Sequence, residues 1–68
     1  MRPRVEIRVR GPVRLDQVDR LGLEASVAPP DTVLRGVVVD RPALHGVLDA
    51  LHVHGLEVIE VRRLPAAP

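Results

Sequence analysis

The chain has 68 residues, with ten arginines against nine acidic residues, a formal net charge of +1, and no Cys, Lys, Phe, Tyr or Trp. The missing cysteine excludes disulfides and thiolate metal sites, and the missing lysine excludes Schiff-base chemistry. The balanced charge and the lack of Phe, Tyr and Trp for base stacking argue against a nucleic-acid binder.

The small size of the chain predicts a marginal core. A domain of this length buries only roughly 60% of the surface that its unfolded chain exposes, so a metal or a partner subunit is expected to add stability. No apolar run approaches the ~18 residues of a membrane span, and charged residues follow Met1 closely. We therefore expect a cytoplasmic protein that does not enter a membrane.

The first predicted strand covers residues 4–10, where apolar and charged residues alternate. Val5, Ile7 and Val9 share the face that we expect to be buried. Gly11-Pro12 closes the strand, and residues 13–21 have helical spacing over two turns or fewer.

Two strands are predicted next, joined as a hairpin through residues 28–31. The strand over residues 21–27 places Leu21, Leu23, Ala25 and Val27 on one face. The strand over residues 32–39 is apolar on both faces, which is typical of a strand in the middle of a sheet.

A long helix is predicted from a cap at Asp40 or Arg41 to about His54, with Gly55 as its stop. Residues 56–64 form the last predicted strand, and residues 65–68 a flexible tail. The order predicts one α+β domain over residues 1–64. It would contain a four-stranded antiparallel sheet, one long helix and one stunted helix, in ferredoxin-like (split βαβ) order.

The three histidines lie on or beside the long helix. At about 100° per residue, His45, Asp49 and His52 form one polar stripe, which is a weak candidate for a metal site. His45 and His52 would be roughly 10 Å apart along the axis, too far to bind one ion directly. We therefore predict a solvated stripe and no cofactor.

The helix side turned away from the sheet is expected to carry small or uncharged residues. Ala43, Gly46, Ala50 and Val53 lie there, although an exposed helix usually has charged residues on that side. Either a compositional bias towards Ala and Gly filled this surface, or it packs against a second subunit or a partner protein.

The charged face of the first strand also has two interpretations. Arg4, Arg8 and Arg10 could bind an anion, with Arg35, Arg62 and Arg63 on neighbouring strands. The other interpretation is a solvated sheet face, on which these arginines pair across strands with Glu57 or Glu60.

The C-terminal half carries a recognisable pattern: Thr32-Val-Leu-Arg-Gly36, Ala43-Leu-His-Gly-Val-Leu48, Gly55-Leu-Glu57 and Val61-Arg-Arg-Leu64. It resembles a set of short uncharacterised actinobacterial proteins that share TVLxG, ALHGLL, LGL and a VRRL-like closing strand. The resemblance implies no activity.

These observations favour a small non-catalytic interaction or regulatory module, acting as a homo-oligomer or as an accessory subunit of a larger protein. The small-residue side of the long helix or a sheet edge would make the contact. A domain that binds a small anion at a subunit interface is the alternative. An enzyme that uses His45 for acid–base chemistry is the third hypothesis, and it would need a pocket that so small a core can hardly enclose.

Overall fold

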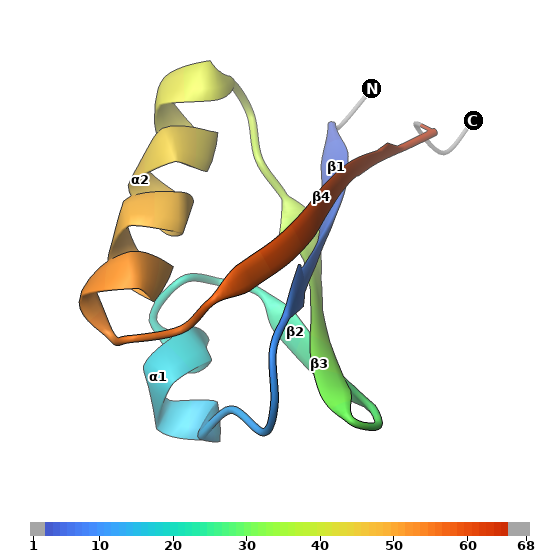
Figure 1. Cartoon of the computed structure of the whole chain (residues 1–68). Helices are drawn as coiled ribbons and strands as arrows, with labels where there is room; N and C mark the ends of the chain where they lie inside the picture. The colour runs from blue at the N-terminus through green and yellow to red at the C-terminus, as the bar shows by residue number, and fades with distance from the viewer. Residues whose placement is uncertain (1–2, 66–68) are drawn as a thin grey trace.

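The computed structural model describes residues 3–65, apart from the side chains of Leu15 and Gln17. Its six elements follow the predicted order (Figure 1). They are β1 (Arg4–Val9), α1 (Leu15–Asp19), β2 (Glu24–Ala28), β3 (Asp31–Val37), α2 (Arg41–Val53) and β4 (Val58–Leu64). The predicted tail has only Pro65 in this range, and residues 66–68 lie outside the described residues.

The strands form one four-stranded sheet in the order β2-β3-β1-β4, and every neighbouring pair is antiparallel. This confirms the predicted α+β class, the antiparallel sheet and the internal position of β3. Strands β1 and β2 run in the same direction with β3 between them, and β3 and β4 do so with β1 between them. Both helices lie on one side of the sheet, which leaves its other face open (Figure 1).

The core lies between the sheet and the helices. Val5, Ile7 and Val9 of β1 are buried, as their alternation predicted, and Leu34 lies beside Ile7 on β3. Leu51 of α2 is fully buried against this apolar surface. Full burial of one such side chain stabilises the fold by about 1.5–3 kcal/mol, so the core depends on few residues.

The predicted shared face of β2 is only partly buried. Leu23 is buried and Ala25 packs against the core, but Val27 is 80% exposed. Strand β2 is an edge strand, and Val27 lies near its end, so it has a neighbouring strand on one side only. The alternation of apolar residues therefore predicted which face of β2 carries Val27, but not how far its side chain is buried.

Helix α2 begins and ends where its capping residues predicted. The Asp40 side chain accepts a hydrogen bond from the backbone N–H of Ala43 at 2.8 Å, which makes Asp40 the N-cap. At the other end, Gly55 has a φ of 78°, and the N–H of Leu56 donates to the carbonyl of Leu51 at 2.9 Å. Within residues 3–65, no helix is long and apolar enough to cross a membrane.

Candidate functional site

The polar stripe of α2 lies in solvent. His45, Asp49 and His52 are all exposed. Within the described part of the chain, no three His, Asp or Glu side chains are grouped closely enough to hold a metal ion. His54, at the C-cap of α2, lines a separate shallow hollow with Arg14, Asp16 and Arg20.

The small-residue surface of α2 is narrower than the sequence predicted. Gly46 is exposed, and Val53 is 81% exposed. Ala43, however, packs against the core cluster, and Ala50 is half-buried. The helix turns Ala43 partly towards the sheet, so only Gly46 and Val53 are fully presented to solvent.

The open sheet face is a charge-paired surface. Arg8 lies 3.6 Å from Asp31, and Arg35 lies 3.5 Å from Glu6. Beyond the end of β1, Arg10 forms an ion pair with Glu57, which is one of the cross-strand partners that the sequence predicted. Of the three predicted anion-binding arginines, Arg8 and Arg10 therefore already have carboxylate partners, whereas Arg4 lies between Val37 and Leu64 in the strand register.

The outer edge of β4 was not identified from the sequence. This seven-residue strand pairs only with β1 among the described strands, and Ile59 and Val61 are 44% and 38% exposed along it. Glu60 and Arg62 stand on the open face on either side of Val61, with side chains 3.8 Å apart. The signal in the sequence was the Glu-Val-Arg triplet, in which opposite charges flank an apolar centre.

The other edge strand is better protected. Strand β2 has five residues and leads directly into the turn at Pro29-Pro30. A short strand that ends at prolines is a poor template for another chain, because proline cannot donate a backbone hydrogen bond. Strand β4 is therefore the more open edge of the sheet.

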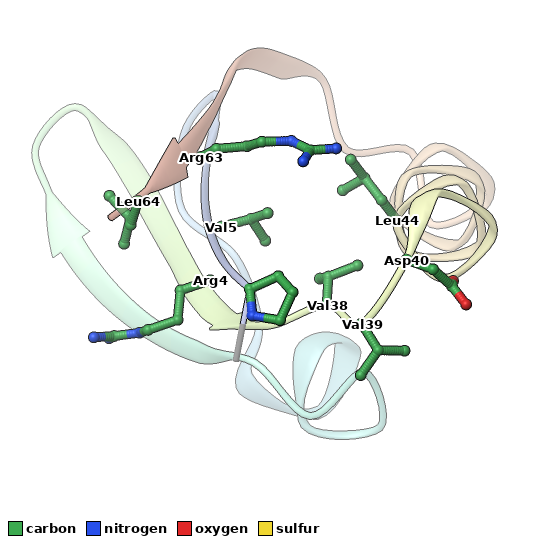
Figure 2. Close-up of a pocket in the computed structure, with 9 residues that line it drawn as sticks. Arg4, Val5, Val38, Val39, Asp40, Leu44, Arg63 and Leu64 are labelled. Atoms are coloured by element: carbon green, nitrogen blue, oxygen red, sulfur yellow. The ribbon is translucent and has the colours of Figure 1, made fainter. Parts of the chain in front are cut away.

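A cavity of about 150 Å³ lies between the sheet and the N-terminal end of α2 (Figure 2). Val5, Val38 and Leu44 point into it, and the Arg63 side chain extends across it towards Leu44. The sequence grouped Arg63 with the charged sheet face, which is wrong. Arg63 is the register partner of Val5 and so shares the face that carries the helices.

A second hollow, of about 200 Å³, lies beside the turn between β2 and β3 and is lined largely by apolar residues, among them Val13, Val27 and Pro30. Its one ionic residue, Asp31, already pairs with Arg8. This hollow therefore offers no unpaired charge to orient a ligand.

Comparison with known proteins gives a family but no activity. No curated protein matches the chain. The matching family model is described as a domain of unknown function (DUF8691), and it covers residues 4–62, from the first residue of β1 to within β4. The chain therefore belongs to the DUF8691 family.

Proposed function

We propose that the protein is a small non-catalytic interaction module that forms a symmetric homodimer through the edge of β4. In this dimer, two copies of β4 pair antiparallel and join the two sheets into one. The observation that carries the proposal is the self-complementary charge pattern of β4 around Val61.

The two-fold pairing places opposite charges across the new strand contact. With Val61 opposite Val61 of the second copy, Glu60 lies opposite Arg62 of that copy, and the symmetry repeats the pair. Both residues stand on the open sheet face, and the register irregularity of β4 lies outside these three positions. Each opposite-charge pair across strands contributes roughly 0.2–1 kcal/mol, and new backbone hydrogen bonds add to this.

The exposed apolar residues of β4 also favour this contact. Ile59 and Val61 would lose solvent contact when a second strand lies alongside. Burying apolar surface stabilises an association by about 25 cal/mol per Å². A chain this small, with few fully buried residues, gains more from such burial than a large domain does.

A charge-exchange experiment tests this contact. Glu60→Arg alone and Arg62→Glu alone each place like charges opposite each other, so each variant is expected to be monomeric by light scattering at low micromolar concentration. An equimolar mixture of the two variants restores both opposite-charge pairs and is expected to give a heterodimer. Wild-type protein that is monomeric across the accessible concentrations would refute the proposal.

Glu24→Arg is the matched control, because it places an arginine opposite Arg35 on the other edge strand. The Glu60→Arg change likewise places an arginine opposite Arg8 within its own sheet. Both variants therefore carry a similar like-charge cost to folding, but only Glu60→Arg is expected to change the molar mass. Equal effects would mean that the loss of mass reports weakened folding.

The exposed Gly46 and Val53 on α2 support a second contact surface, which the sequence favoured. A Cβ at Gly46 meets nothing within 4 Å, so Gly46→Glu fits the folded monomer. If the dimer forms through β4, Gly46→Glu is expected to keep the wild-type molar mass. A loss of mass in Gly46→Glu together with unchanged mass in Glu60→Arg would assign the contact to α2.

We also infer that the domain is ferredoxin-like. The interleaving of two same-direction strand pairs, with both helices on one side, supports this assignment. The fold does not imply an activity, because the same topology carries many functions. The cytoplasmic location and the resemblance to short actinobacterial proteins stay predictions from the sequence.

A further inference from the structure

We propose that the cavity between the sheet and α2 binds a short aliphatic carboxylic acid, with the Arg63 guanidinium holding its carboxylate. This inference does not depend on the dimer. It rests on the lining of the cavity, on the position of Arg63, and on the charges that surround it.

The wall of the cavity is apolar where it is deepest. Val5 and Val38 are buried, and Leu44 of α2 is half-buried opposite them (Figure 2). The volume of about 150 Å³ has room for about five water-sized groups at roughly 30 Å³ each. A branched chain of three or four carbons fits this space and displaces water from an apolar wall.

Among the described residues, no carboxylate pairs with the charge that Arg63 brings to the cavity. The register between β4 and β1 places Arg63 beside Val5, and its side chain extends along the cavity towards Leu44 (Figure 2). Arg8, Arg10, Arg35 and Arg62 each form an ion pair with a side-chain carboxylate, whereas none of the ion pairs found among residues 3–65 includes Arg63. The guanidinium therefore has donors to offer to a ligand.

Of the charged residues that line the cavity, Arg63 is the one that extends across it, which favours a small monoanion as the ligand. The Asp40 carboxylate is turned away from the cavity (Figure 2), and it caps α2 by accepting from Ala43. Arg4 also points away from the cavity (Figure 2). One guanidinium matches one carboxylate in a two-point hydrogen bond, whereas a phosphate or a dicarboxylate would leave a second charge facing an apolar wall.

Titration of ¹⁵N- and methyl-labelled protein with sodium isovalerate tests the proposal. Saturable NMR shifts are expected at Val5, Val38 and Leu44. Arg63→Met keeps the aliphatic stem and removes the charge, so it should weaken binding by at least about tenfold. Arg41→Met is the control, because it removes the same charge from a neighbouring residue that does not line the cavity, and it should bind as the wild type does.

Two further probes separate the contributions to binding. 3-Methyl-1-butanol has the same branched chain without the carboxylate, so it should bind at least about tenfold more weakly than isovalerate. Sodium phosphate should give no saturable shift at the three cavity residues. Equal binding of isovalerate by Arg63→Met and wild type, or shifts confined to the open sheet face around Arg8, would overturn the proposal.

The same titration in Glu60→Arg distinguishes this inference from the proposed dimer. Isovalerate should shift the cavity resonances of this variant with wild-type affinity, whatever its molar mass. The spectrum of unliganded Arg63→Met must match wild type away from the cavity, so that lost binding reports the missing charge rather than a lost fold. Loss of binding in Glu60→Arg would contradict a site contained within one chain.

Discussion

At the scale of single residues, Gly36 shows how little space the core leaves. It lies in β3 with ordinary backbone geometry, so its backbone conformation does not require glycine. A Cβ at this position would come within 2.4 Å of Leu23 Cδ2 and 3.3 Å of the Gly22 carbonyl oxygen. Because Gly36 has no side chain, the buried Leu23 side chain can pack directly against the β3 backbone.

We predict that Gly36→Ala destabilises the protein by about 1–3 kcal/mol, because Leu23 must leave its packed position. Gly46→Ala is the matched change on α2, where a Cβ meets nothing within 4 Å. It should stabilise the protein by about 1 kcal/mol through helix propensity. Urea unfolding followed by circular dichroism measures both, and a Gly36→Ala protein as stable as wild type would mean that Leu23 repacks without cost.

At the scale of elements, α2 depends on its caps and on its buried Leu51. Its first turn contains Pro42, and it has no acidic residue there that would favour the helix dipole. The Asp40 side chain is the group that satisfies the Ala43 N–H. Helix α1 has only five residues and contacts β2, so α2 supplies most of the helical cover of the sheet.

We predict that Asp40→Ala lowers the free energy of unfolding by about 1 kcal/mol, since the first turn loses its N-cap acceptor. Asp49→Ala serves as the comparison, because it removes the same charge from an exposed position within the helix. It should be neutral or slightly stabilising. Thermal unfolding of both variants separates the cap from a general charge effect, and equal losses would show that the cap hydrogen bond contributes nothing specific.

At the scale of the whole molecule, the proposed dimer links stability to association. A typical stability of about 0.05–0.15 kcal/mol per residue gives a chain of this length about 3–10 kcal/mol. A partner that binds only the folded state adds to this by mass action. In the proposed dimer, the chain gains such stability from a second copy of itself at the open edge of β4.

We predict that the melting temperature of the wild type rises as protein concentration increases from low to high micromolar, because only folded chains can form the proposed dimer. The melting temperature of Glu60→Arg should not depend on concentration. Differential scanning calorimetry at several concentrations measures both. A wild-type melting temperature that stays constant over this range would argue against any self-association that contributes to folding.

What the sequence determined by itself was local: the alternation of Val5, Ile7 and Val9, the cap at Asp40 and the stop at Gly55. These signals act within a few residues, through side-chain alternation and backbone hydrogen bonding, so the sequence alone is enough to predict them. The apolar character of β3 was enough to predict an internal strand. It could not show which strands lie beside β3, because that depends on contacts between distant segments.

The tertiary structure alone decided the neighbours of β4 and the two faces of its tandem arginines. Alternation requires Arg62 and Arg63 to point to opposite faces, but only pairing with β1 assigns Arg63 to the helix side. The tertiary structure also brings Arg8 beside Asp31 and leaves Glu60 and Arg62 on the open edge of the sheet. Strand register is a long-range property, and a shift of one residue exchanges the two faces, so the cavity and the self-complementary edge appear only in the folded chain.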